Sequence, residues 1–244
     1  MLDASIESLL AGTRPHPLRM LMGRLLGLGL TITGKHRYDS FRLEWVLGMP
    51  ILVMPSVANP KVLRTGAFFA SQIDTRLFRP ESSVLDMGTG SGVCALFAAR
   101  VVHRVVAVDI NPAAVRCASV NAMLNHLEKR IAFRQGDLFA PVEGERFDVV
   151  LFNPPFLIGV PKDDRDAAWR STDAARRFAA GLADHLKPGG SALLLLSSFG
   201  DACALFELEL RARGFRLEVF ARRRYINETL TILRATTGAS EPRT

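Results

Sequence analysis

The sequence is poor in the residues that build covalent or metal-held frameworks. It has three cysteines in 244 residues, at positions 94, 117 and 203, and we expect each to lie inside a helix. Its five histidines, at positions 16, 36, 103, 126 and 185, show no spacing typical of a metal site. A disulfide framework and a zinc site are therefore not indicated, and we expect a reducing, cytoplasmic setting.

Long uninterrupted apolar runs are also missing. The most apolar stretch near the N-terminus, LRMLMGRLLGLGL, is broken by Arg19 and Arg24, and the acids Asp3 and Glu7 precede it. This pattern fits neither a signal peptide nor a membrane-spanning helix. We expect an amphipathic helix over residues 16–30 that packs on its own domain, with docking of a partner as the alternative.

Lysine is scarce, because 26 of the 31 basic residues are arginine. The net charge of +7 is thus a weak guide to a polyanionic partner, since arginine content also follows genome composition. The excess lies in residues 1–80, which carry ten basic and five acidic side chains. A negatively charged partner for this part of the chain is one interpretation.

What the chain does contain is a regular alternation of strand-like and helix-like segments from residue 82 onward. The strand-like segments are SSVLDM, RVVAVDI, IAFRQGD, FDVVLFN, SALLLLSS, FRLEVFARR and ETLTILRA. Helices are expected over residues 92–101, 112–127 and 171–187, the last ending at Lys187-Pro188-Gly189-Gly190. Alternation of this kind predicts an α/β fold with a doubly wound parallel sheet.

The segment before this alternation is expected to be a small appendage. FRLEWVLGMPILVMP is typical of two short strands around Gly48-Met49-Pro50, and residues 58–78 of a loop leading into a helix. We therefore divide the chain into an N-terminal appendage (1–60), a main domain (61–235) and a frayed tail (236–244).

A glycine-rich turn follows the first strand of the main domain. Asp86 ends this strand, and Gly88, Gly90 and Gly92 lead into a helix. Glycines at such a turn let a ligand approach the backbone, and the helix start offers free N–H groups. A dinucleotide is one candidate, but its G-x-G-x-x-G/A fingerprint requires a small residue where this chain has Val93.

Polar side chains also end the next strands. Asp109 ends the second strand, Asp137 follows the third, and Asn153 ends the fourth. Because the carboxyl ends of parallel strands meet at one edge, these side chains are expected to line one crevice together with Asp86. Three acids suit a cationic ligand without phosphates, and S-adenosylmethionine matches through its sulfonium, ammonium, ribose hydroxyls and adenine amine.

The fourth strand stops abruptly at a stiff elbow. FDVVLF is apolar without alternation, as in a strand buried on both faces, and Asn153-Pro154-Pro155 cannot continue a ladder. The elbow would hold the Asn153 amide, the Pro154 carbonyl and the Phe156 ring at the crevice. Two fixed acceptors would orient the lone pair of a planar nitrogen, and the ring would stack on the planar group.

These motifs resemble those of class I S-adenosylmethionine-dependent methyltransferases, in their usual order: VLDMGTGSG, VVAVDINPAAVRCASVNA, QGDLF and NPPF. The resemblance is strongest to the HemK-like N-methyltransferases, and the C-terminal half is more similar to their compact archaeal and eukaryotic members. It implies a Rossmann-like seven-stranded sheet whose last strand is antiparallel. The cofactor contacts expected with it are Asp86, Gly88, Thr89, Gly90, Ser91, Asp109, Ile110, Asn111, Asp137, Leu138 and Asn153.

The sequence therefore predicts a methyltransferase that acts on a planar nitrogen. Its expected catalytic residues are Asn153, Pro154, Pro155 and Phe156, and no metal is expected. The resemblance favours a protein glutamine as acceptor, ahead of an exocyclic amine of adenine or guanine in RNA or DNA, and then of a small metabolite. The rival hypotheses are a non-catalytic module that binds S-adenosylmethionine and recruits a partner, and a nicotinamide oxidoreductase.

Overall fold

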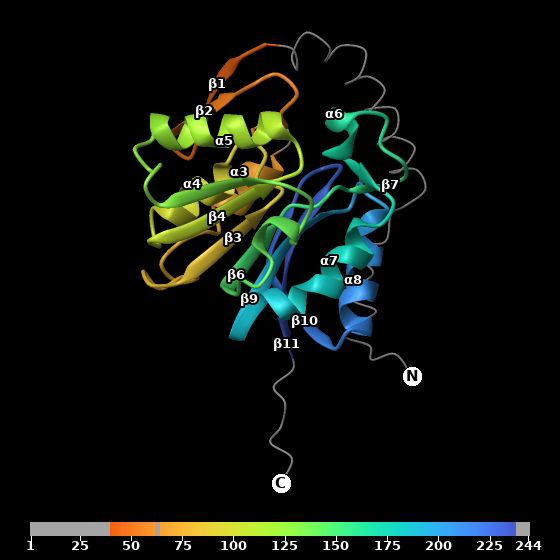
Figure 1. The fold of residues 1–244 in the computed structure, drawn as a ribbon. Coiled ribbons are helices and arrows are strands. Elements are labelled where there is room, and N and C mark those ends of the chain that lie inside the picture. Colours follow the sequence, from red (N-terminus) through yellow and green to blue (C-terminus); the bar gives the residue numbers. More distant parts are fainter. Residues whose placement is uncertain (1–39, 62–63, 238–244) are drawn as a thin grey trace.

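The structure is a computed structural model that describes residues 40–61 and 64–237 (Figure 1). The helix expected over residues 16–30 lies outside the described residues. Within the described part, no helix is both long and apolar enough to cross a membrane.

The centre of the molecule is a seven-stranded sheet with the order β10-β11-β9-β6-β3-β4-β5. Strand β11 pairs antiparallel with β9 and β10, whereas β9, β6, β3, β4 and β5 are mutually parallel. The predicted sheet with an antiparallel last strand is confirmed. The strands are β3 (Ser83–Met87), β4 (Arg104–Asp109), β5 (Ile131–Gln135), β6 (Phe147–Phe152), β9 (Leu186–Ser197), β10 (Phe215–Arg224) and β11 (Thr229–Thr237).

Helices cover both faces of this sheet and form two cores. Helices α3 (Thr65–Ala70), α4 (Val93–Ala99) and α5 (Pro112–Leu124) lie on one side, and α7 (Ala174–Leu182) and α8 (Ala202–Ala212) on the other (Figure 1). Strand β6 shows why such a strand must be apolar throughout: Val149 and Leu151 face the first core, and Val150 and Phe152 the second. Buried free thiols of all three cysteines lie in α4, α5 and α8.

The helix predicted over residues 171–187 is shorter than expected. Arg170 and Ser171 form strand β8, which pairs with β7 (Leu157–Ile158), and α7 ends at Leu182 before a short 3-10 turn, η2 (Ala183–His185). Residues 187–190, read as the stop after the helix, belong to the start of β9. Strand β6 pairs with β9 at Phe147↔Leu186 and again at Val149↔Ser191, so the extra residues bulge out of the ladder.

A hairpin packs against α5 at one side of the sheet. Its strands are β1 (Arg42–Val46) and β2 (Met49–Val53), and the turn is Leu47-Gly48 rather than the predicted Gly48-Met49-Pro50. The fully buried Asn121 of α5 accepts a 2.7 Å hydrogen bond from the Leu52 N–H and donates to the Leu52 carbonyl at 2.7 Å. It also donates to the Ser91 carbonyl at 2.9 Å. One side chain thus joins the hairpin to the glycine-rich turn.

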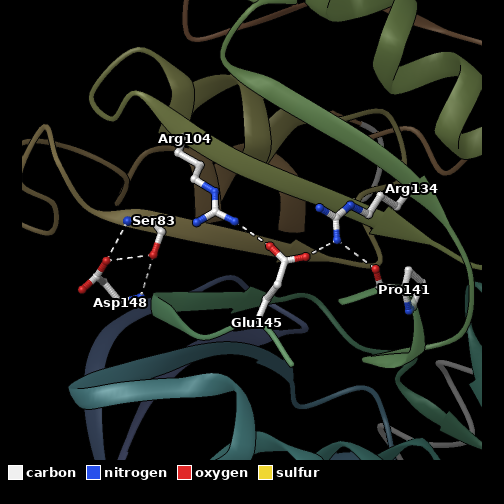
Figure 2. Close-up of polar contacts among 6 residues, drawn as sticks. All are labelled: Ser83, Arg104, Arg134, Pro141, Glu145 and Asp148. Carbon is white, nitrogen blue, oxygen red and sulfur yellow. Dashed lines mark hydrogen bonds and ion pairs between the residues drawn. The ribbon is translucent and has the colours of Figure 1, made fainter. Parts of the chain in front are cut away.

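Polar and ionic contacts link neighbouring strands, mostly near the residues at which the strands begin (Figure 2). The Asp148 carboxylate of β6 accepts hydrogen bonds from the N–H and hydroxyl of Ser83 in β3, at 2.7 and 2.9 Å. It also pairs with Lys187 of β9 at 2.7 Å. Glu145 bridges Arg104 of β4 and Arg134 of β5. Polar and ionic contacts therefore link β6 to β3 and β9, and link β4 and β5 to the loop before β6, whereas the carboxyl ends of the strands are left for the site.

Candidate active site

A cavity of about 370 Å³ opens at the carboxyl ends of β3, β4 and β6. This is the edge where open α/β sheets bind ligands. All predicted site residues except Asp86 line it: Gly88, Thr89, Gly90, Ser91, Asp109, Ile110, Asn111, Asp137, Leu138, Asn153, Pro154, Pro155 and Phe156. Topology thus brings together segments that lie more than 60 residues apart in the chain.

Asp109 connects the turns after β3 and β4. One carboxylate oxygen accepts the Gly90 N–H at 2.8 Å, and the other accepts the Asn111 N–H at 2.9 Å. Burial raises the pKa of the Asp109 carboxyl, and the hydrogen bonds from these backbone amides oppose that rise. A carboxylate has about four acceptor positions, and backbone amides of Gly90, Asn111 and Ile110 interact with this one, so Asp109 keeps capacity for a ligand hydroxyl.

Asp86 lies beneath the glycine-rich turn, outside the cavity lining. Its carboxyl is 4% exposed and accepts hydrogen bonds from the Thr89 hydroxyl at 2.6 Å and the Ala95 N–H at 3.0 Å. Burial raises the pKa of Asp86 to about 7, with hydrogen bonding from Thr89 acting against the rise. In this structure its contacts shape the turn and the start of α4.

The glycines of the turn have a stereochemical role. Gly88, Gly90 and Gly92 have φ values of +64°, +56° and +84°, which L side chains rarely adopt. A Cβ atom on Gly92 would also lie 2.9 Å from the Ala118 Cβ in α5, so the turn needs glycine there for packing as well. Open backbone remains on the cavity side at Gly90, where a Cβ atom would meet nothing within 4 Å.

Asp137 lies at the far end of the cavity and is paired. Its carboxylate accepts a 2.7 Å hydrogen bond from Arg177 of α7, and both side chains are about two-fifths exposed. Hydrogen bonding to Asp137 raises the pKa of Arg177. Arg177 lines the cavity but was missed at the sequence level, because nothing local marks which turn of a helix meets a distant loop.

The Asn153 side chain is the most unusual polar group in the cavity. Its Nδ2 donates to the Thr65 hydroxyl at 3.4 Å, and Thr65 is 3% exposed at the start of α3. Its Oδ1 atom is buried and has no hydrogen-bond partner among the described residues. A buried acceptor without a donor costs about 1–3 kcal/mol, so this oxygen favours a ligand that brings an N–H or O–H group.

The loop that follows Asn153 is held from outside the cavity. The Phe156 carbonyl accepts the Ala202 N–H at 3.1 Å, and the Asp201 carboxylate accepts the Ile158 N–H at 2.7 Å. Gly200 lies directly against Phe156. The segment between β9 and α8 thus fixes the direction in which Phe156 points, a role without a signal in the local sequence.

An aromatic wall lies beside this loop. Trp169, which precedes β8, stands edge-on to Phe156, with ring centroids 6.4 Å apart, and both side chains line the cavity. Pro161 and Ala167 of the same excursion, which contains the short helix α6 (Asp164–Ala167), also contribute to the lining. The apolar wall suits the flat faces of a planar acceptor group.

The sheet order and the cavity at its carboxyl edge define a Rossmann-like methyltransferase. The chain belongs to the methyltransferase small domain family, whose profile matches residues 58–214. The prediction of a class I, HemK-like methyltransferase is confirmed.

Known proteins are similar to this chain over different lengths. A Methanocaldococcus jannaschii protein with the provisional name protein N5-glutamine methyltransferase is 35% identical over 162 residues, which are 62% of this chain and 80% of that protein. The release factor glutamine methyltransferase of Moorella thermoacetica is 38% identical over 130 residues, 48% of this chain and 46% of its own length. The chain thus spans about half of the latter enzyme.

The same fold occurs in a solved structure of the T. thermophilus 16S rRNA N2 G1207 methyltransferase in complex with AdoMet and guanosine. It superposes with a TM-score of 0.59 at 22% identity and covers 82% of this chain and 50% of that one. At this identity the likeness concerns the fold.

The residues present fit S-adenosylmethionine. Asp109 keeps acceptor capacity for a ribose hydroxyl, the open backbone at Gly90 admits a ligand against the turn, and Asp137 and Leu138 line the far end of the cavity. No group of three or more histidine, cysteine or acidic side chains that could hold a metal ion occurs among the described residues.

Proposed function

We propose that the protein transfers the methyl group of S-adenosylmethionine to a planar carboxamide nitrogen, namely that of a glutamine side chain in a protein. The observation that carries this proposal is the Asn153 Oδ1 atom, which is buried in the cavity wall and lacks a donor among the described residues. A carboxamide NH₂ group supplies that donor. The names of the glutamine methyltransferases to which the chain is similar support this acceptor.

The geometry addresses the weakness of the nucleophile. A carboxamide lone pair is delocalised into its carbonyl, so its direction must be fixed before it can react. One N–H of the acceptor donates to Asn153 Oδ1 and the other to the Pro154 carbonyl, while Phe156 stacks on the amide plane. Holding two reactants in line contributes on the order of 7 kcal/mol of barrier reduction.

Bound S-adenosylmethionine supplies an electrophilic methyl carbon on a sulfonium. The new N–C bond would form as the S–CH₃ bond breaks and S-adenosylhomocysteine leaves with the bonding electron pair. The acceptor nitrogen would then become cationic, and its N–H groups would become stronger donors. Asn153 and Pro154 therefore bind the transition state more tightly than the ground state, which is the condition for catalysis. One N–H proton then leaves to solvent, so a strong base is not required.

The proposal is tested with tritiated methyl donor, purified protein and cell extract, divided between protease and nuclease digestion. Label released by protease and recovered as N-methylated glutamine is the expected result. Label released by nuclease alone would assign the acceptor to a nucleobase. Label that remains in small molecules would assign it to a metabolite.

The variant Asn153→Ala tests the mechanism in the same assay. We expect transfer to fall at least about a hundredfold, because one of two fixed acceptors is lost. Affinity for S-adenosylhomocysteine, measured by calorimetry, should change less than about threefold, because the turns at Gly90 and Asp109 are intact. Unchanged turnover would remove Asn153 from the mechanism, and binding of NAD instead would indicate an oxidoreductase.

A further inference from the structure

A group of basic side chains surrounds one tyrosine beside the cavity. We define the arginine–tyrosine cluster as Arg64, Arg223, Arg224, Tyr225 and Ile226. We propose that this cluster binds an acidic segment of the protein that presents the methylated glutamine. The inference rests on the proposed function and extends it to how the acceptor protein docks.

Strand directions place the cluster at the edge that carries the site. β10 is antiparallel to β11, β11 is antiparallel to β9, and β9 is parallel to β6. β10 therefore runs in the same sense as β6, and its last residues, Arg223 and Arg224, reach the edge at which Asn153 lies. In Figure 1 the blue hairpin of β10 and β11 turns at this same end of the sheet.

Arg64 joins the cluster to the cavity. It directly precedes Thr65, whose hydroxyl contacts Asn153, and its guanidinium lies 5.0 Å from the centre of the Tyr225 ring. Arg64 has a φ of +59°, in the left-handed region that residues other than glycine seldom adopt. Backbone strain of this kind persists where the surrounding structure enforces it and is concentrated at functional sites.

The cluster is exposed and its charges are uncompensated by ion pairs. Arg64, Arg223 and Arg224 are exposed, and the described residues offer none of them a carboxylate within 4 Å. The nearby acid, Glu228, accepts a 2.6 Å hydrogen bond from the Ser197 hydroxyl. Burial raises the pKa of Glu228, and this hydrogen bond and the charge of Arg64 act against the rise, so Glu228 interacts with Arg64 without forming an ion pair within 4 Å. Three arginines on one rim attract carboxylates and form bidentate contacts with them.

The details favour an acidic polypeptide over RNA. Arg223 also lies over the Tyr225 ring, 5.7 Å from its centre, so the ring already has two guanidinium groups over it and is a poor platform for stacking bases. Ile226 is fully exposed at the tip of the turn. An exposed apolar side chain among arginines suits a partner that combines carboxylates with apolar residues.

The first test is binding of a labelled glutamate–tyrosine copolymer, measured by fluorescence anisotropy. We expect Arg223→Glu to weaken binding about fivefold and to flatten its salt dependence. The matched control is Arg216→Glu, the same charge reversal at an exposed position on the opposite end of β10, which should weaken binding less than about twofold. Equal weakening by both variants would overturn the proposal, since the binding would then follow net charge.

Two further measurements distinguish an acidic polypeptide from RNA as the partner, and the docking proposal from the proposed function. If Arg223→Glu weakens binding of poly(U) more than binding of the copolymer, the surface is a nucleic-acid surface and our assignment is wrong. Ile226→Ser should weaken binding of the copolymer and leave binding of poly(U) unchanged. In the methyl-transfer assay, Arg223→Glu should lower the rate with dilute extract, whereas with concentrated extract the rate should equal that of the parent protein. Specific copolymer binding without labelled protein would refute the proposed function and leave the docking surface standing.

Discussion

Gly200 packs directly against Phe156, and this contact leaves no space for a side chain at position 200. A Cβ atom on Gly200 would lie 2.1 Å from the Phe156 carbonyl oxygen and 2.7 Å from its Cβ atom. We expect Gly200→Ala to displace the loop that carries Pro154 and Phe156. Displacement of about 1 Å in a reacting geometry can cost a hundredfold in rate, so methyl transfer should fall by about that factor.

The measurement for Gly200→Ala compares turnover with affinity for S-adenosylhomocysteine. Affinity should stay within about threefold, because Gly200 lies outside the cavity lining. Gly48→Ala is a suitable control, since it strains a glycine of the β1–β2 turn where a new Cβ atom meets nothing within 4 Å. Loss of turnover in both variants would indicate general destabilisation, and retained turnover in Gly200→Ala would show that the loop tolerates the shift.

Asn121 supplies three hydrogen bonds that join the hairpin to the glycine-rich turn. Asn121→Ala leaves the Ser91 carbonyl and the Leu52 N–H without partners, and the Leu52 carbonyl keeps only the Cys117 thiol, so we expect a loss of about 2–4 kcal/mol in the free energy of unfolding in urea. Affinity for S-adenosylhomocysteine should also fall, because the Ser91 carbonyl loses its support. The control Asn125→Ala removes a half-buried side chain that contacts the Pro50 carbonyl and should cost less.

Asp86 makes stability depend on pH in an unusual direction. Its pKa is about 7 in the folded protein and near 3.8 when unfolded, so the folded state binds the extra proton between these values. The contribution of Asp86 to the free energy of unfolding is therefore fully present below about pH 4 and falls as the pH rises to about 7. Above about pH 7 it no longer changes with pH. In Asp86→Asn this dependence should vanish, so the variant should gain stability relative to the parent as pH rises from about 5 to about 8 in denaturant unfolding.

Asp148 provides a control of opposite sign. Burial alone would raise its pKa, but the Lys187 ammonium and the Ser83 hydrogen bonds outweigh burial and lower it. Its contribution to stability is therefore present above about pH 4 and lost as pH falls further. Asp148→Asn should leave the window between pH 5 and pH 8 unchanged. If both variants changed that window equally, the assignment to Asp86 would be wrong.

Much of the sheet was predictable because its strands are buried on both faces. Val149 to Phe152 are apolar without alternation, and they are followed by Asn153-Pro154-Pro155. A strand of this kind must lie in the interior, and its end must lie at the ligand edge. The glycines near Asp86 and the acid Asp109 were predictable for the same reason, since each lies at a strand end.

Pairings between distant segments were not predictable. The start of β9 at Leu186 depends on a bulge opposite Phe147, and nothing in the local sequence of residues 187–190 shows it. The contact of Arg64 with Tyr225 joins positions 161 residues apart. In the sequence, Asn121 is one polar residue within an expected helix. Its hydrogen bonds depend on a hairpin that packs against that helix. The local periodicity of the sequence does not predict such contacts.

The two rims of the sheet differ in what they contain, and this has a practical consequence. Asp148 pairs with Lys187 where β6 and β9 begin, and Glu145 pairs with Arg104 and Arg134, whereas the cavity opens at the carboxyl ends of the strands. Substitutions at the ion pairs are therefore expected to change the stability of the sheet, whereas substitutions in the cavity lining are expected to change which molecule is bound.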